Sequence, residues 1–269
     1  MSEDDTAVVS YSVQGKFAIV TLNNPKRLNA LTTPQFARLA GIMTEIDGLD
    51  QVLVTVLTGV GRFFSAGANL ASREPQTDPD TGRHWLQTYV ARNIFLTDAF
   101  STHSKIIVAA LNGPAVGGGA AVAAFADFAY ATPLTYLLTP FASLGLVAEV
   151  GTSYTLVQKL GISLANEALL VGRKISSAEL VRCGFVNKII PADGEMFLPA
   201  VMKELNDQFG HHLNLESVLC IKALINRPSR KARDMQNVSE VFAVWRRLTL
   251  GVFDREVDRM QSGQKRHKM

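Results

Sequence analysis

The stretch IIVAALNGPAVGGGA, residues 106–120, determines which fold this sequence can adopt. Its first six residues form a short apolar run, typical of a strand buried on both faces, and Asn112-Gly113-Pro114 ends that run. The glycines and alanines that follow predict a tight turn into a helix, whose first turn has unpaired backbone N–H groups. A strand that passes through a small-residue loop into a helix is typical of an α/β fold.

The same alternation extends to both sides of this stretch. Further strands are predicted at 17–22, 52–58, 127–131 and 185–190, and helices at 33–46, 82–103, 117–125, 152–160, 163–171 and 176–182. Strands separated by helices imply crossover connections and a mostly parallel sheet. The pattern then becomes wholly helical, near 196–209, 212–226, 231–247 and 251–262. We therefore predict an α/β core over residues 1–195 and a helical C-terminal region over residues 196–269.

Composition excludes several classes of protein. The chain has 269 residues, 47% of them hydrophobic and 19% charged, so it can bury a large core and is not disordered. A net charge of +3 gives no sign of nucleic-acid binding. No apolar run is long enough to span a membrane, and residues 1–5 are acidic, unlike a secretory signal. We expect a soluble, intracellular protein without nucleic-acid or membrane partners.

No metal or redox site is predicted. Cys183 and Cys220 lie far apart and form neither a metal motif nor a disulfide framework. His103, His211 and His212 have no carboxylate or cysteine at ligand spacing, so we expect them at solvated helix positions. We expect Lys222 to be a surface charge or a trimer contact. The glycine run 117–119 lacks the G-x-G-x-x-G spacing of a dinucleotide site, and the acidic residue expected about twenty positions later is missing.

A second small-residue loop, FFSAGANL at residues 63–70, also follows a strand. Its glycine and alanines allow a ligand to approach the backbone, and Asn69 can cap a short helix after it. Taken alone, either loop is more often a product of tight packing than a ligand site.

Together, the two loops resemble the oxyanion loops of the crotonase (enoyl-CoA hydratase/isomerase) superfamily. Three other segments resemble the same family in the same order along the chain: NPKRLNAL at 24–31, PFASLGL at 140–146 and GRKISSAE at 172–179. The resemblance implies a crotonase-like spiral of ββα units with a helical C-terminal trimerisation region. It also implies an acyl-CoA thioester as substrate, a homotrimer or hexamer, and no metal or other cofactor.

The resemblance assigns roles to particular residues. The backbone amides of Ala68 and Gly118 would donate to the thioester oxyanion, and each such donor is worth roughly a hundred- to a thousandfold in rate. The residues expected to contact the substrate are Lys26, Arg27, Leu28, Ala66, Gly67, Asn69, Leu70, Gly117, Phe141 and Leu146. For Lys26 and Arg27, a solvated turn is an equally good interpretation.

The position of the carboxylates indicates the subclass. Hydratases of this family carry two glutamates, and the matching positions here are Ala121 and Phe141. Instead, Glu149 stands where fungal peroxisomal Δ3,Δ2-enoyl-CoA isomerases carry their catalytic glutamate. An apolar pocket of Phe141, Leu146 and Val150 would raise its pKa toward the working pH. The alternative is that Glu149 is a solvated or helix-capping carboxylate.

The helix at 89–100, YVARNIFLTDAF, resembles the same isomerases, and its Asn93 is placed to bond Glu149 or a water; otherwise Asn93 is a polar surface residue. We predict a one-carboxylate Δ3,Δ2-enoyl-CoA isomerase of fatty-acid β-oxidation. Two alternatives stay open: a dienoyl-CoA isomerase or other biosynthetic crotonase-type enzyme, and a non-catalytic acyl-CoA-binding paralogue. The end His267-Lys268-Met269 resembles a degenerate peroxisomal signal, or else is a basic tail.

Overall fold

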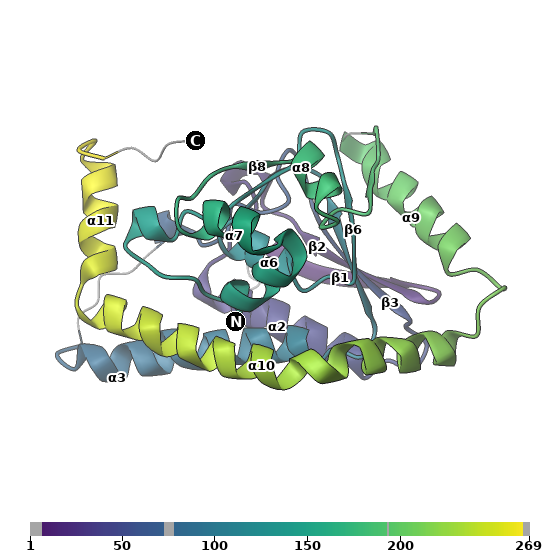
Figure 1. The fold of residues 1–269 in the computed structure, drawn as a ribbon, viewed down its shortest axis with the longest axis horizontal. Helices are drawn as coiled ribbons and strands as arrows, with labels where there is room; N and C mark the ends of the chain where they lie inside the picture. Colours follow the sequence, from purple (N-terminus) through teal and green to yellow (C-terminus); the bar gives the residue numbers. More distant parts are fainter. Residues whose placement is uncertain (1–6, 73–77, 193, 266–269) are drawn as a thin grey trace.

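A mostly parallel sheet forms the centre of the computed structural model, which describes residues 7–72, 78–192 and 194–265 (Figure 1). Its strands are β1 (Val9–Gln14), β2 (Phe17–Leu22), β3 (Val54–Gly59), β4 (Ile106–Leu111), β6 (Phe128–Ala131) and β9 (Lys188–Ile189). They lie in the order β1-β2-β3-β4-β6-β9, with β1 antiparallel to β2 and the other neighbours parallel. This confirms the predicted α/β class. Strand β1 was not predicted, because its sequence VSYSVQ is that of a half-exposed edge strand without an apolar run.

Alternate residues of the central strands point to two separate cores, as the pleat of a strand requires. Leu57 faces the core that lies under helix α2 (Thr33–Asp47) and helix α4 (Ala91–Ser101). Val54 and Val56 face the other side, which α9 (Phe197–Gln208) covers. Helix α2 begins at Thr33, and its N-cap is Thr32, which forms a capping box with Gln35.

A second, smaller sheet supports the glycine loop. It joins β5 (Ala115–Val116), β7 (Tyr136–Leu138) and β8 (Ile175–Ser176), which are too short for a periodic sequence signal. The helices near it are α5 (Gly118–Ala123), α6 (Thr152–Leu160), α7 (Ile162–Leu169) and α8 (Ser177–Arg182). Because β5 leads directly into α5, the sheet fixes where the first turn of α5 lies.

The C-terminal helices lie against the rest of the chain. Helix α10 (Leu215–Thr249) runs along one edge of the molecule and contacts α3 (Thr81–Trp85), α4 and α6, while α11 (Val252–Gln261) packs on the short helix η4 (Ala142–Leu144) (Figure 1). The prediction of two helices at 212–226 and 231–247 is wrong, because α10 continues through Pro228. A proline inside a helix costs about 3 kcal/mol, and the long packed face of α10 offsets it. Within the described parts, no helix has the length and apolarity to cross a membrane.

Two residues expected at the surface are buried. His103 is 3% exposed and its Nε2 lies 2.8 Å from the Thr55 hydroxyl. Lys222 is also buried, and its Nζ forms an ion pair with Asp127 at 2.7 Å. Sequence spacing could not reveal this, since the partners come from distant elements.

Candidate active site

Two loops that the sequence marks as small-residue segments lie against each other. Gly67 has φ +83°, and a Cβ placed on it would lie 2.6 Å from the Val116 oxygen and 2.9 Å from the Gly118 nitrogen. Such contacts are too short for any side chain, so glycine is required both for the backbone angle and for the close approach. The loop at 63–70 and the loop at 112–120 therefore form one surface.

Buried polar side chains hold the first loop in shape. Asn29 is fully buried; its amide donates to the oxygens of Val60 (3.0 Å) and Phe63 (2.7 Å), and its oxygen accepts the N–H of Asn24 (2.8 Å). The Ser65 hydroxyl donates to the backbone oxygen of Asn29 at 2.8 Å and accepts the Gly67 N–H at 3.1 Å. These bonds fix the backbone of residues 63–70, and a site built from backbone donors needs such a fixed geometry.

The N–H groups of Ala68 and Gly118 have no hydrogen-bond acceptor within residues 7–72, 78–192 and 194–265. Residues 66–69 pair with residues 28–31 through bonds from Ala66 to Leu28, from Leu31 to Gly67 and from Asn69 to Leu31. This parallel pairing turns the Ala68 N–H away from the paired segment. Gly118 is the first residue of α5, where helical N–H groups have no internal acceptor. Among the described residues, neither N–H donates a hydrogen bond.

Glu149 lies in the loop between η4 and α6. Its carboxyl faces the helical turn that precedes α4. The Tyr89 hydroxyl donates to Glu149 Oε2 at 2.7 Å, and the Asn93 amide donates to that same hydroxyl oxygen at 3.1 Å. Asn93 is thus buried and reaches Glu149 through Tyr89, not by the direct bond considered from the sequence. No other described residue donates to the carboxyl of Glu149. The Glu149 side chain does not cap α6, the helix that begins after it, and the residue is half-buried.

A local change of helix type brings Tyr89 to Glu149. The predicted helix at 82–103 is interrupted by a π-helical turn, η3 (Leu86–Val90), before α4 begins at Ala91. A π turn shifts the following side chains around the helix axis, and such turns are frequent at functional sites. Tyr89 was not singled out from the sequence, since nothing in periodicity marks a π turn.

The surroundings of Glu149 shift its protonation. Burial raises the pKa of Glu149 above its ordinary value, while the hydrogen bond from Tyr89 and the charge of Arg92 act in the opposite direction. Burial and the adjacent Glu149 charge raise the pKa of Tyr89 well above its ordinary value, so this phenol stays protonated and donates. Glu149 can therefore accept and return a proton nearer to neutral pH than an exposed glutamate.

A chain of contacts joins Glu149 to the two amides. The Arg92 guanidinium lies 5.2 Å from the ring centre of Tyr89 and 5.7 Å from that of Phe36. The Phe36 ring in turn lies against Gly118, 3.0 Å from where a Cβ would stand. The carboxyl, the arginine and the glycine loop thus belong to one region of the molecule.

Apolar side chains enclose Tyr89. Leu70, Leu144 and Leu146 pack in one cluster with Tyr89 and with Val241, Val244 and Leu248 of α10. Phe141 is buried, 3% exposed, and Val150 belongs to the main core. Of the predicted pocket residues, only Leu146 is thus placed in the cluster around Tyr89.

The other predicted contact residues lie at the rim or in the loops. Lys26 and Arg27 are exposed on the short helix η1 (Pro25–Arg27). Leu28 has φ +55°, and its oxygen accepts the Ala66 N–H. The Asn69 side chain accepts the N–H of Ala71 at 3.2 Å, at the start of η2 (Leu70–Ser72), as the capping prediction requires. The positions of the hydratase glutamates, Ala121 and Phe141, are buried and carry no charge.

Comparison with known proteins agrees with this geometry. The sequence model of the family described as enoyl-CoA hydratase/isomerase matches residues 12–242. The chain belongs to the enoyl-CoA hydratase/isomerase family. This confirms the family that the two loops indicated.

Several members of the enoyl-CoA hydratase/isomerase family are similar over most of the chain. A Δ(3,5)-Δ(2,4)-dienoyl-CoA isomerase of Pyricularia oryzae is 46% identical over 98% of this chain and 100% of its own length. A 3,2-trans-enoyl-CoA isomerase of Saccharomyces cerevisiae is 34% identical over 87% of this chain and 86% of its own. The crystal structure of an enoyl-CoA hydratase/isomerase from Pseudoalteromonas atlantica superposes with a TM-score of 0.82, at 26% identity, over 97% of this chain and 100% of that one.

Proposed function

We propose that this protein moves the double bond of a 3-enoyl-CoA to position 2, with Glu149 as the group that carries the proton. The observation that supports this most directly is a carboxyl of raised pKa that, among the described residues, accepts one hydrogen bond, from Tyr89, and has no second free carboxylate beside it. A substrate of this class needs one proton removed from C2 and one added at C4, on the same face. A single carboxylate can do both.

In this proposal the amides of Ala68 and Gly118 receive the thioester oxygen. As Glu149 removes the C2 proton, negative charge moves onto that oxygen, and two fixed N–H groups stabilise it without reorganisation. The electron pair then shifts along the chain as C4 takes the proton back from Glu149. Because Tyr89 occupies Oε2, Oε1 is the oxygen that exchanges the proton.

Glu240 of helix α10 is a second buried carboxyl, and it contacts the backbone just after Glu149. Its two oxygens accept the N–H groups of Gly151 and Ser153 at 2.7 and 2.6 Å. It is therefore occupied and not a second proton carrier.

A dienoyl-CoA isomerase is the second candidate, favoured by the 46% identity to the Pyricularia oryzae protein of that name. Moving two conjugated double bonds transfers the proton from C2 to C6, a longer path that a second acid would assist. Since Ala121 and Phe141 supply none, the shorter transfer fits this site better.

The remaining proposals follow the family. Lys26 and Arg27 would meet the phosphates of CoA, and trimers or hexamers would form. No cofactor beyond the CoA of the substrate is proposed. A role in peroxisomal β-oxidation would depend on His267-Lys268-Met269, which lies outside the described residues.

Turnover of 3-enoyl-CoA and of 3,5-dienoyl-CoA by the purified protein, compared with Glu149→Gln, tests the proposal. We expect isomerisation of the 3-enoyl substrate and a loss of roughly a hundred- to ten-thousandfold in the variant, with acyl-CoA binding kept. Activity that survives the substitution would remove Glu149 from the mechanism. Turnover of the dienoyl substrate alone would select the second candidate, and binding without any turnover would indicate a non-catalytic paralogue.

A further inference from the structure

The backbone turn that follows Glu149 has an unfavourable conformation. The Thr152 N–H donates to the Glu149 oxygen at 3.2 Å, which closes a four-residue turn. Its central residues, Val150 and Gly151, have φ of +55° and +72°. Positive φ at both central positions is the pattern of a type I′ turn, in which asparagine and glycine are preferred. A β-branched residue there is a genuine outlier.

This strain lies next to the proposed proton carrier. Val150 is bonded directly to Glu149, so the dihedral angles of Val150 set the direction of the chain at Glu149 relative to α6. If Val150 relaxed to negative φ, the turn would open and the carboxyl would move relative to Tyr89. Groups outside the turn must therefore hold it closed.

Glu240 of α10 is the principal such group. Its Oε2 accepts the N–H of Gly151 and its Oε1 accepts the N–H of Ser153, so one carboxylate holds two amides of the turn. Glu240 is 4% exposed, and helix α6 has no capping side chain of its own. The Thr152 hydroxyl adds a bond to the Glu149 oxygen at 2.8 Å.

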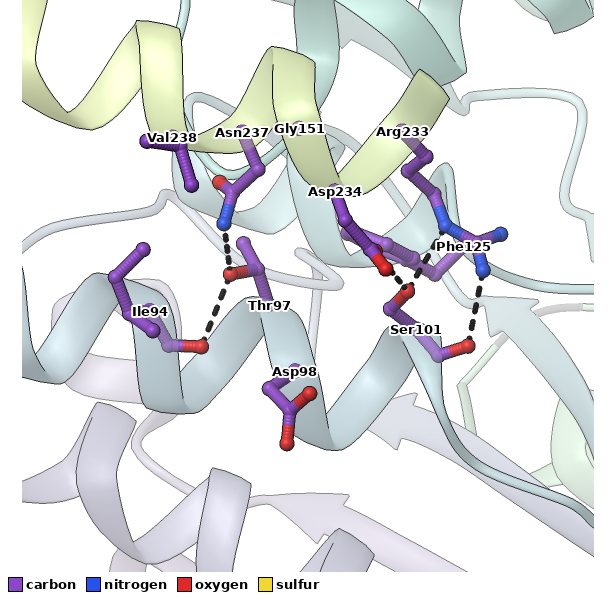
Figure 2. A pocket seen from close by; sticks show the side chains of 10 residues that line it. All are labelled: Ile94, Thr97, Asp98, Ser101, Phe125, Gly151, Arg233, Asp234, Asn237 and Val238. Atoms are coloured by element: carbon purple, nitrogen blue, oxygen red, sulfur yellow. Dashed lines mark hydrogen bonds between the residues drawn. The ribbon is translucent and has the colours of Figure 1, made fainter. Parts of the chain in front are cut away.

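Hydrogen bonds to helix α4 anchor helix α10 within two turns of Glu240. Figure 2 shows Asn237, Arg233 and Asp234 of α10 reaching side chains of α4 across the cavity that Gly151 also lines. The Asn237 amide donates to the Thr97 hydroxyl, and that hydroxyl donates to the backbone oxygen of Asn93 at 2.8 Å. The same helix face thus fixes both Glu240 and the helix that carries Asn93.

We propose that Glu240 is a positioning residue: its carboxylate holds the left-handed Val150–Gly151 turn closed and so directs the Glu149 carboxyl. The inference rests on the proposed function of Glu149. The proposed role of Glu240 makes helix α10 necessary for catalysis, although α10 supplies no group to the reacting atoms.

Glu240→Gln tests this, because a carboxamide has one acceptor oxygen and cannot hold both amides. We expect kcat to fall by about tenfold or more, since displacement of a catalytic group by about 1 Å can cost a hundredfold, while KM stays within about threefold. Adding Val150→Gly to Glu240→Gln should restore much of kcat, because glycine adopts positive φ without strain. Glu216→Gln, an exposed carboxylate on the same helix, is the matched control and should leave kcat unchanged.

Amide hydrogen exchange gives a readout that needs no turnover. The Gly151 and Ser153 amides should exchange faster in Glu240→Gln than in the wild type, even if the substrate class is wrong. Wild-type kcat with unchanged exchange in Glu240→Gln would overturn the proposal, as would a double variant no more active than Glu240→Gln. If Glu240→Gln alone does not fold, the proposal requires that the double variant fold and turn over substrate; an unfolded double variant would contradict it.

Discussion

At the scale of single residues, the groups around one carboxyl decide whether it can act as a base. Glu149 is surrounded by Tyr89, by the Arg92 guanidinium and, across the turn, by Glu240. Burial favours the protonated carboxyl, whereas Tyr89 and Arg92 favour the carboxylate. The balance keeps the pKa of Glu149 raised, but less than burial alone would raise it.

Tyr89→Phe should shift the pH dependence of catalysis. The hydrogen bond from Tyr89 lowers the pKa of Glu149, so its loss raises that pKa further. A base is active when deprotonated, and the acid limb of the kcat profile therefore moves to higher pH. At neutral pH we expect kcat to fall, because a smaller fraction of Glu149 is deprotonated, with little change in KM.

The measurement is kcat against pH for the wild type, Tyr89→Phe and Tyr11→Phe. Tyr11 lies on the edge strand β1 and, unlike Tyr89, donates no hydrogen bond to Glu149, so its variant should keep the wild-type profile. An acid limb that stays in place, or moves to lower pH, in Tyr89→Phe would show that the bond does not control Glu149.

At the scale of elements, the site depends on the contact between two loops. Segments 63–70 and 112–120 follow β3 and β4, which are parallel neighbours. Both loops therefore leave the sheet at the carboxyl ends of these strands. The contact between them is too close for any side chain at Gly67.

Gly67→Ala should abolish most activity. The added methyl group would meet the Val116 oxygen and the Gly118 nitrogen and would push the loops apart. If one of the two proposed oxyanion donors is misplaced, kcat falls roughly a hundred- to a thousandfold. The assay is turnover of the 3-enoyl substrate, together with a melting curve to show that the variant is folded.

Gly161→Ala is the matched control for that variant. Gly161 also has positive φ, +75°, but a Cβ there would meet no atom within 4 Å, and the residue joins α6 to α7. It should lower stability by roughly 1–3 kcal/mol and leave kcat close to the wild-type value. Equal loss of kcat in both glycine variants would contradict the assignment of Gly67 to the site.

At the scale of the whole molecule, ionisable side chains from distant elements lie together beside helix α10. His103 lies beside Asp47 and Thr55, and Lys222 of α10 pairs with Asp127. Burial first, and then the charge of Lys222, lower the pKa of His103 from 6.5 to about 4.

Folding should therefore become less favourable in acid. Between pH 6.5 and about 4 the unfolded chain protonates His103 while the folded chain does not, so the stability from neutral His103 is present above pH 6.5 and is lost as the pH falls. The loss amounts to about 3 kcal/mol, from about 1.4 kcal/mol for each pKa unit. Denaturant unfolding should be measured for the wild type and His103→Gln at pH 7 and pH 4.5. The free energy of unfolding should fall more between the two pH values for the wild type than for the variant. An equal fall in both proteins would contradict this prediction.

Local sequence determined much of this protein. Apolar runs of six residues marked the central strands, since burial on both faces demands them, and small residues marked both loops, since close backbone approach demands those. Glu149 stood out because the other carboxylate positions of the family, Ala121 and Phe141, are apolar.

Only the tertiary structure decided how these parts act together. Tyr89 reaches Glu149 through a π turn, and Glu240 holds the Val150 turn from 89 residues further along the chain. Pro228 stays inside α10, and Lys222 is buried, because packing outweighs the local preferences of both residues. Propensity and spacing describe what a residue prefers among its neighbours in sequence, whereas a hydrogen bond between distant elements exists only once the fold has brought them together.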